Sequence, residues 1–501
     1  MLKSKQIGLF LGIAVFLGIL LFTNFDPGNP SITIMAAVAS LMAIWWISEA
    51  IPLAATSLIP FILFPLLGIC SGEEIASSYI NSTIFLFLGG FLIALSMEKW
   101  ALHKRIALKI ILFLGGSPSK IVFGFMTAAF FLSMWISNTA TAVMMLPIGL
   151  AIIYQLEEEF SKEKVHNFSV SVMLGIAYGC SIGGISTLIG TPPNLSFIRI
   201  LKIIFPHSPD ISFANWLIMA MPISIIMLFT AWFVLTKIYF RIPGEIKIEK
   251  NIISDEYKKL GRLAYEEKAV GIIFVFTALL WIFRVNIDLG FIKIYGWSNI
   301  FNNSAFINDG TVAVFMAIVL FLIPSKDKTK GDSLLSADVF TKIPWGIILL
   351  FGGGFALAKG FITSGLSDFI GSQFQGMKFT SPMAIMGLVS VTITFMTELT
   401  SNTATTEMIL PILASVSIAL DVNPMLLMMS ATLSASMAFM LPVATPPNAV
   451  IFGSQRIKVS EMAKAGLLLN LTGVIVITLS VYFIGLFVFN IDLDQLPGWI
   501  K

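Results

Sequence analysis

Two short polar motifs occur twice in this chain, inside segments that are otherwise apolar. The triplet Ser-Asn-Thr stands at 137–139 and again at 401–403, and each copy is followed by Thr-Pro-Pro-Asn, at 191–194 and 445–448. Proline has no N–H to donate to a helix, and lipid cannot hydrogen-bond the peptide groups that such a break frees. The duplication therefore predicts two repeats with a protein-enclosed binding cavity between them, which is typical of a secondary transporter.

The composition places these motifs in a membrane. Of the 501 residues, 57% are hydrophobic and 12% are charged, whereas about a quarter of the residues of a soluble domain are charged. The formal net charge of +3 indicates no basic domain that would bind nucleic acid. Cys70 and Cys180 stand singly in apolar surroundings, so they predict neither a metal site nor a disulfide. We expect an all-α polytopic membrane protein.

The apolar stretches predict eleven transmembrane helices and two re-entrant helical hairpins. The hairpins are 121–153 and 381–420, because each is interrupted midway by Ser-Asn-Thr. A cleaved secretory signal is the alternative for the first stretch, but no small-residue cleavage pattern follows it. The predicted crossings, judged by the length that a bilayer requires, are 7–23, 32–50, 52–70, 82–98, 169–198, 214–240, 268–284, 307–323, 343–362, 424–453 and 463–490.

The positions of Lys and Arg predict the orientation. With the N-terminus in the cytoplasm and the C-terminus outside, most of the 31 Lys and Arg residues fall in cytoplasmic connections, as the positive-inside rule requires. An odd number of crossings separates the hairpins, so they enter from opposite faces and the repeats are inverted. A basic, amphipathic stretch at 99–112 predicts a helix that lies on the cytoplasmic surface.

The breaks predict an anion site that depends on cations. Pro192 and Pro193 should leave the carbonyls of Leu188 and Ile189 without helical partners, and such oxygens suit Na⁺. Ser, Asn and Thr are preferred N-caps, and the N-terminus of a half-helix attracts an anion. No Lys or Arg lies within ten residues of either Ser-Asn-Thr. We therefore infer that bound Na⁺ ions supply the charge that the anion needs.

Two acidic residues and a glycine run are weaker candidates. Glu398 and Glu407 flank the second triplet, where the first repeat has Met134 and Val143. An intramembrane carboxylate is a functional hypothesis by default, and a structural role in hydrogen bonds to backbone or water is the alternative for both. The run at 352–354 lacks the Lys of a phosphate loop, so close helix packing is the preferred interpretation.

The motif pairs, together with WWISEAIPLAATSLIPFILFPLLGI and PWGIILLFGGGFALAKGF, resemble the divalent anion/sodium symporter (DASS) family, of the sodium/dicarboxylate cotransporter type. The resemblance covers nearly the whole chain. It implies a homodimer in the cytoplasmic (inner) membrane, with a transport domain that moves like an elevator against a scaffold domain. With the predicted topology, the parts are 1–120 (first scaffold part), 121–240 (first transport part), 241–267 (cytoplasmic connection), 268–380 (second scaffold part) and 381–501 (second transport part).

The resemblance also implies site residues. The first sodium site would use Ser133, Ser137, Asn138 and the backbone of Gly190, and the second would use Thr397, Asn402 and the backbones of Thr400 and Ala444. The substrate carboxylates would meet Ser137, Asn138, Thr139 and Thr191 on one side, and Ser401, Asn402, Thr403 and Thr445 on the other. Two positions depart from the family pattern: Thr191 stands where many dicarboxylate carriers have serine, and Glu407 where a small or apolar residue is expected.

We therefore expect a symporter that imports Na⁺ with a divalent anion, and a four-carbon dicarboxylate such as succinate, fumarate or malate is the preferred substrate. A sodium-independent dicarboxylate or anion exchanger and a sodium/sulfate symporter are the alternatives within transport. An anion channel is the alternative from another class. An enzyme is disfavoured, because no Cys/His pair, carboxylate pair or metal cluster occupies the breaks.

Overall fold

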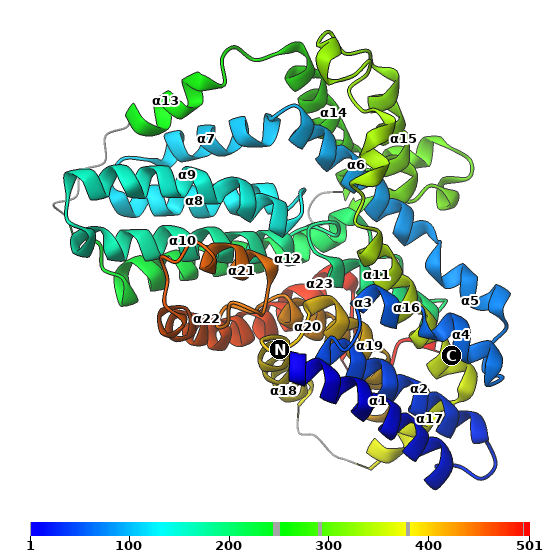
Figure 1. Cartoon of the computed structure of the whole chain (residues 1–501). Helices are drawn as coiled ribbons and strands as arrows, with labels where there is room; N and C mark the ends of the chain where they lie inside the picture. The colour runs from blue at the N-terminus through cyan, green and yellow to red at the C-terminus, as the bar shows by residue number, and fades with distance from the viewer. Residues whose placement is uncertain (1, 244–250, 289–292, 377–380, 494, 501) are drawn as a thin grey trace.

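The computed structural model describes residues 2–243, 251–288, 293–376, 381–493 and 495–500. Outside the described residues lie 244–250 of the predicted cytoplasmic connection, 289–292 and 377–380 of the second scaffold part, and 494 and 501 of the last part. The chain is built almost entirely of helices (Figure 1). One short antiparallel pair, β1 (Ile287–Asp288) and β2 (Lys293–Ile294), departs from the all-α expectation.

The helices of the first half follow the predicted order. They are α1 (Leu2–Phe22), α2 (Pro30–Ser48), α3 (Leu53–Thr56), α4 (Ile59–Leu66), α5 (Gly72–Tyr79), α6 (Ser82–Lys99), α7 (Leu102–Leu114), α8 (Pro118–Ser133), α9 (Asn138–Glu159), α10 (Lys162–Gly184), α11 (Pro192–Ile204) and α12 (Phe213–Phe233), which continues as a π-helical turn (Val234–Tyr239).

The helices of the second half repeat the pattern. They are α13 (Asn251–Lys259), α14 (Tyr265–Ile282), α15 (Asp309–Leu322), α16 (Trp345–Ser364), α17 (Leu366–Phe374), α18 (Pro382–Thr397), α19 (Asn402–Ala419), α20 (Pro424–Ala435), α21 (Pro446–Phe452), α22 (Val459–Ser480), a π-helical turn (Val481–Gly485) and α23 (Leu486–Phe489). Single 3₁₀ turns cover Trp297–Ile300, Ser304–Phe306, Lys328–Lys330, Ala337–Thr341 and Gly498–Ile500.

All four predicted breaks interrupt helices. The Ser-Asn-Thr motifs separate α8 from α9 and α18 from α19, so both predicted hairpins are helix pairs broken where expected. The segments before Thr-Pro-Pro-Asn separate α10 from α11 and α20 from α21. The surface helix predicted at 99–112 is α7. The helix α17, between the ninth predicted crossing and the second hairpin, was not expected.

The segment 52–70 is not the single spanning helix that we predicted. It forms two short helices, α3 and α4, separated at Ser57 and Leu58. Pro60 has no N–H to donate to the carbonyl of Thr56, four residues earlier, and it stands in the first turn of α4, where the missing N–H costs nothing. The apolar composition was identified correctly, but the proline positions were given too little weight.

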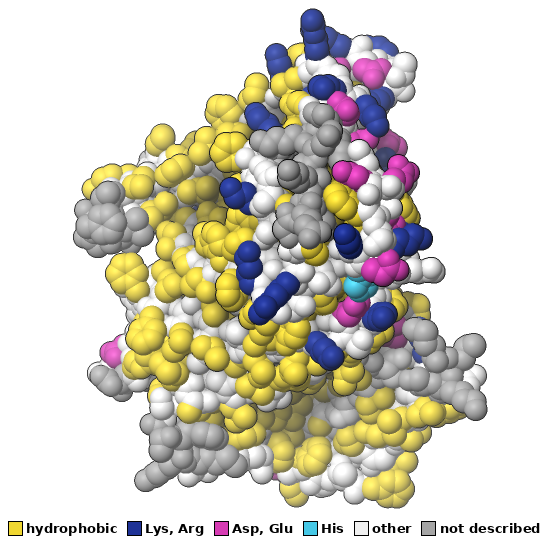
Figure 2. Space-filling model, turned by 90° about the vertical axis from the view of Figure 1, so that its left-hand side faces the viewer, with side chains coloured by type: hydrophobic (Ala, Val, Ile, Leu, Met, Phe, Trp, Pro, Cys, Tyr) yellow, Lys and Arg dark blue, Asp and Glu magenta, His cyan; other side chains and the backbone are white. Residues whose placement is uncertain are grey.

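The number of crossings stays a prediction. By length and composition, eight of the described helical segments are able to span a membrane, and five more apolar helical segments are shorter. The eight include α9, which we assigned to a re-entrant hairpin and which continues past 153 to Glu159. Figure 2 shows hydrophobic side chains over much of one face, with Lys, Arg, Asp and Glu gathered along one side of it. This distribution suits a protein surrounded by lipid.

The helix α16 connects the two predicted domains. It packs against α2, α3, α4 and α5 of the first scaffold part, and also against α11 and α19, which belong to the transport parts (Figure 1). The glycine run at 352–354 makes these contacts possible: a Cβ at Gly352 would lie 2.1 Å from the ring of Tyr79, and one at Gly353 would lie 2.6 Å from the carbonyl oxygen of Ser57. The packing interpretation of this run is therefore confirmed.

Candidate functional site

Four helices begin at the four breaks. Ser137 is the N-cap of α9 and accepts a hydrogen bond from the backbone N–H of Ala140 at 3.3 Å. Ser401 caps α19 in extended backbone geometry, without a side-chain cap bond. The N-caps of α11 and α21 are Thr191 and Thr445. The capping bond predicted for Ser-Asn-Thr is thus observed at Ser137 but not at Ser401; Thr445 also accepts from the N–H of Asn448 at 3.3 Å, and Thr191 makes no such bond. Each start presents backbone N–H groups that the helix itself does not use.

The double prolines act differently from what we predicted. They occupy the first positions of α11 and α21, where a missing N–H costs nothing. The preceding helices have already ended, at Gly184 and Ala435. The carbonyls of Leu188 and Ile189 are thus free because they lie in a non-helical segment, and not because prolines interrupt a continuing helix.

Around Asn138, oxygen atoms converge closely. Ser133 Oγ donates to Asn138 Oδ1 at 2.8 Å, and the Ser133 side chain is fully buried. A Cβ built on Gly190 would lie 2.4 Å from the carbonyl oxygen of Gly184 and 3.0 Å from that of Ser133. A Cβ on Gly184 would lie 2.8 Å from Asn138 Oδ1. Only glycine fits at both positions, and the arrangement brings together the predicted ligands of the first sodium site other than Ser137.

The second repeat has the same arrangement around Asn402. Thr397 Oγ1 donates to Asn402 Oδ1 at 2.7 Å and shares its one hydrogen with the carbonyl oxygen of Ala435, which lies at 2.9 Å. Thr397 is fully buried, like its counterpart Ser133. The predicted ligand Thr400 lies in the break itself, and its hydroxyl is 2.5 Å from that of Thr405. The two asparagines thus hold equivalent positions, each hydrogen-bonded to a hydroxyl one turn before its break.

The asparagines of Thr-Pro-Pro-Asn brace the breaks, a role that we had not assigned to them. Asn194 Nδ2 donates to the carbonyl oxygen of Thr187 at 2.7 Å, and Asn448 Nδ2 donates to those of Ala438 and Leu441 at 3.1 Å each. Both asparagines are fully buried. The signal in the sequence was their presence in both copies of the motif.

Glu398 has the structural role that we gave as its alternative. Its carboxylate accepts backbone N–H groups from residues 439, 440 and 441, at 2.7, 2.9 and 3.0 Å, and the side-chain amide of Asn470 at 2.7 Å. These bonds hold the segment between α20 and α21. In the first repeat the corresponding segment is held differently, because Thr187 Oγ1 donates to the carbonyl oxygen of Met134 at 2.5 Å.

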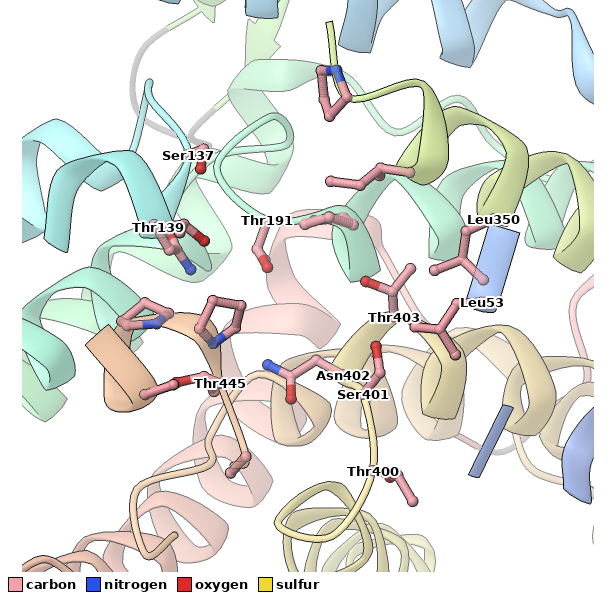
Figure 3. A pocket seen from close by; sticks show the side chains of 18 of the residues that line it. Leu53, Ser137, Thr139, Thr191, Leu350, Thr400, Ser401, Asn402, Thr403 and Thr445 are labelled. Atoms are coloured by element: carbon pink, nitrogen blue, oxygen red, sulfur yellow. The ribbon is translucent and has the colours of Figure 1, made fainter. Parts of the chain in front are cut away.

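The breaks face one cavity of about 800 Å³. Figure 3 shows Ser137 and Thr139 on one side of it and Ser401, Asn402 and Thr403 on another, with Thr191 and Thr445 between them. Ser133 and Thr397 do not line the cavity, and they reach it only through the asparagines that they contact. The predicted residues that line it are Ser137, Asn138, Thr139, Gly190, Thr191, Thr400, Ser401, Asn402, Thr403, Ala444 and Thr445.

Charge is scarce in this cavity. Lys5 and Glu49 are the charged residues that line it among those described, and they pair with each other at 3.6 Å. The positive ends of α9, α11 and α19 lie at the polar breaks instead, and helix N-termini favour anions. The rest of the wall includes aromatic side chains that we did not predict as lining residues, among them Phe87, Phe91 and Trp135.

This geometry can be compared with known proteins. Residues 3–489 match the family described as "Sodium:sulfate symporter transmembrane region". The chain belongs to this family. It is 43% identical to a protein of Staphylococcus saprophyticus named "Sodium-dependent dicarboxylate transporter SdcS", over 98% of this chain and 93% of the relative. A protein of the same name from Staphylococcus aureus strain MRSA252 shows the same identity and coverage. The predicted DASS membership is confirmed.

Two solved structures share the fold at low sequence identity. The Alcanivorax borkumensis YdaH transporter superimposes with a TM-score of 0.55 at 12% identity, covering 89% of this chain and 98% of that one. Neisseria gonorrhoeae MtrF gives a TM-score of 0.55 at 13% identity, covering 96% and 98%. Family and fold together identify a multi-pass membrane transporter and not an enzyme.

Proposed function

We propose that this protein couples the inward movement of Na⁺ to the import of a dicarboxylate, most specifically a four-carbon one such as succinate, fumarate or malate. The names of the most similar relatives support sodium dependence and dicarboxylate transport. The observation that carries the proposal is the pair of equivalent asparagine–hydroxyl contacts, Ser133–Asn138 and Thr397–Asn402, whose asparagines open on a single cavity.

The residues around these contacts fit Na⁺. The atoms nearest to a Cβ at Gly184 and at Gly190 are oxygens, Asn138 Oδ1 at 2.8 Å and the Gly184 carbonyl oxygen at 2.4 Å, and hard cations such as Na⁺ prefer oxygen ligands. Ser133, Ser137, Asn138 and Gly190 would hold one ion, and Thr397, Thr400, Asn402 and Ala444 the other. When bound, each ion supplies positive charge to a cavity whose one lysine among the described lining residues is paired with Glu49.

The chain itself binds and orients the anion. The hydroxyls of Ser137 and Thr139 lie on one side of the cavity and those of Ser401 and Thr403 on another, with that of Thr191 between them (Figure 3), so two carboxylates would be received at two ends. Backbone N–H groups at the starts of α9, α11 and α19 donate to carboxylate oxygens, as helix N-termini commonly do. Two separated polar ends favour a dicarboxylate over sulfate, whose charge is concentrated at one centre.

The transport step would be a movement of 121–240 and 381–501 against 1–120 and 268–380. In the predicted orientation, Lys5, Glu49 and Pro344 of the cavity wall would lie on the cytoplasmic side, which would make this an inward-open state. An elevator motion would slide the breaks past α6 and α16 towards the outside. The homodimer, the cytoplasmic membrane and an external C-terminus complete the proposal.

Uptake of labelled succinate into proteoliposomes tests it. Uptake should require an inward Na⁺ gradient and should not occur when K⁺ replaces Na⁺. Equal uptake in both salts would contradict sodium coupling, and Na⁺-free counter-transport would indicate an exchanger. Flux without saturation by Na⁺ would indicate a channel.

Sodium-coupled sulfate transport is the second candidate, because the description of the matched family names a sodium:sulfate symporter. Unlabelled sulfate should compete weakly with succinate, and unlabelled fumarate and malate strongly. Sulfate that competes as well as fumarate would favour the second candidate.

A further inference from the structure

Glu407 is a carboxylate buried where the transport parts meet α16. It lies on α19 and is fully buried. Ser196 Oγ on α11 is hydrogen-bonded to Glu407 Oε1. The other oxygen, Oε2, is buried and has no hydrogen-bond partner among the described residues. It points at α16, since a Cβ on Gly354 would lie 1.8 Å from it.

Among the described residues, no cation forms an ion pair with this carboxylate. The helices packed against α19 are α2, α11, α16, α17, α18 and α20, and of these α2, α18 and α20 carry no charged residue. The other three helices carry four charged groups. On α11, Arg199 is half-buried and has no ion pair among the described residues, and Lys202 pairs with Asp210 at 3.0 Å. On α16, Lys359 donates to the carbonyl of Glu74 at 3.3 Å, and Asp368 on α17 is exposed. An ionised carboxylate without a partner is very costly in such a place, and the group neutralises instead.

The fold does not require this acid. By the repeat of the Ser-Asn-Thr motif, Glu407 corresponds to Val143, and by that of Thr-Pro-Pro-Asn, Ser196 corresponds to Val450. The polar pair therefore joins the two repeats, and the symmetry-related pair, Val143 with Val450, is apolar. The environments also differ, because Val143 is 54% exposed whereas Glu407 is not exposed at all.

The glycines that correspond between the two halves also differ in their surroundings. The sequence Phe-X-Gly-Gly-Phe occurs in α6 at 87–91 and in α16 at 351–355, so Gly90 corresponds to Gly354. Gly90 lines the cavity, whereas Gly354 is covered by Glu407. In an inverted repeat the outward-open state exchanges these two environments. That state would separate Glu407 from α16 and expose it to the outer solution.

We propose that Glu407 is a proton-binding site, loaded from the outside, and that it must bind a proton before the surface of α19 can close onto α16. The proposal rests on the elevator motion of the proposed function. The proton passes from external water to the carboxylate while Glu407 is exposed, and it stays on the buried carboxyl group in the inward-open state. It returns to the outside when the carrier reopens, so turnover moves no net proton.

The test is the ratio of wild-type uptake to E407Q uptake in proteoliposomes, with Na⁺ saturating and external pH varied from about 6 to 8 at fixed internal pH. Glutamine is always neutral, and dividing by its uptake cancels any titration of the substrate. An exposed glutamate has an ordinary pKa of about 4.3, so above pH 6 its protonated fraction falls about tenfold per pH unit. When closure of α19 onto α16 limits the rate, wild-type uptake follows this fraction. The ratio should therefore fall by about tenfold per unit towards high external pH. Varying internal pH at fixed external pH should leave it constant.

Two further variants keep the test decisive. E407V introduces the apolar residue of the first repeat. It should transport, and its uptake divided by that of E407Q should not change with external pH. R199Q should keep the wild-type dependence.

The proposal would be overturned if the wild-type ratio did not change with external pH, or if it changed equally with internal pH. It would also be overturned if R199Q lost the dependence on external pH, because that would indicate an ion pair between Arg199 and Glu407. Sodium-dependent uptake that persists in all variants with a flat ratio refutes only this inference. Absence of sodium-dependent uptake in wild type and E407Q alike refutes the proposed function.

Discussion

Replacing Asn138 or Asn402 with alanine tests the site assignment most directly. Each asparagine oxygen lies within 2.8 Å of a buried hydroxyl, on Ser133 or Thr397, and each opens on the cavity. Alanine removes that oxygen from the proposed sodium site and leaves the helix start without its amide. Because the two contacts are equivalent in the inverted repeat, the two variants should have similar effects.

The expected magnitude follows from the contact that is lost. A hydrogen bond or ligand contact to a charged group contributes about 1.5–3 kcal/mol, and about 1.4 kcal/mol corresponds to a tenfold change in an equilibrium constant. Each variant should therefore raise the Na⁺ concentration for half-maximal uptake by about 10- to 100-fold, which abolishes coupled transport at ordinary Na⁺. The effect on folding should be smaller, since Thr397 keeps its bond to the Ala435 carbonyl at 2.9 Å and one neutral hydrogen bond is worth about 1 kcal/mol.

The assay is the sodium dependence of succinate uptake, measured with purified protein of known thermal stability. Ser171→Ala and Ser430→Ala are matched controls, because each hydroxyl is buried in α10 or α20 without a partner among the described residues. Both controls should leave the half-maximal Na⁺ concentration within about twofold of the wild type. Wild-type sodium dependence in both asparagine variants would refute the assignment.

Three other changes follow from the same geometry. Gly190→Ala should raise the half-maximal Na⁺ concentration at least about tenfold, because its Cβ would lie 2.4 Å from the Gly184 carbonyl oxygen; unchanged sodium dependence would count against the first site. Glu398→Gln should lower stability by about 1–3 kcal/mol, since its amide NH₂ faces backbone donors and leaves a buried N–H unsatisfied, and thermal unfolding in detergent measures this. Arg105→Met should lower the unfolding free energy by about 3–5 kcal/mol, because Arg105 pairs with the buried Glu267 at 2.9 Å; a melting temperature equal to wild type would show that this pair contributes little.

The sequence predicted the features that depend on local chemistry. A single Ser-Asn-Thr can lie inside a spanning helix, but its recurrence with the same downstream Thr-Pro-Pro-Asn predicted breaks at 137–139 and 401–403. The duplication then placed the two breaks at one cavity. These inferences needed only the period of the motifs and the inability of lipid to hydrogen-bond peptide groups.

Features that depend on contacts between distant segments could not be predicted. The partner of Glu407 is on α11 and its cover is on α16, and no local pattern links these positions. Lys5 and Glu49 joined the cavity wall for the same reason. The break within 52–70 was different, because Pro60 was visible in the sequence and its consequence for the preceding turn could have been stated.

The two repeats also show which part of the site the duplication preserves. The asparagine–hydroxyl contacts are the same in both halves, whereas the segments behind them are held by different means: a threonine hydroxyl on the carbonyl of Met134 in one, and the carboxylate of Glu398 on three backbone N–H groups in the other. Ligand geometry tolerates little change, because it must match an ion. A supporting segment only has to have its backbone groups satisfied, and several side chains can do this. Equivalent asparagines with unlike supports are therefore what selection for a common ion at the two proposed sodium sites would leave.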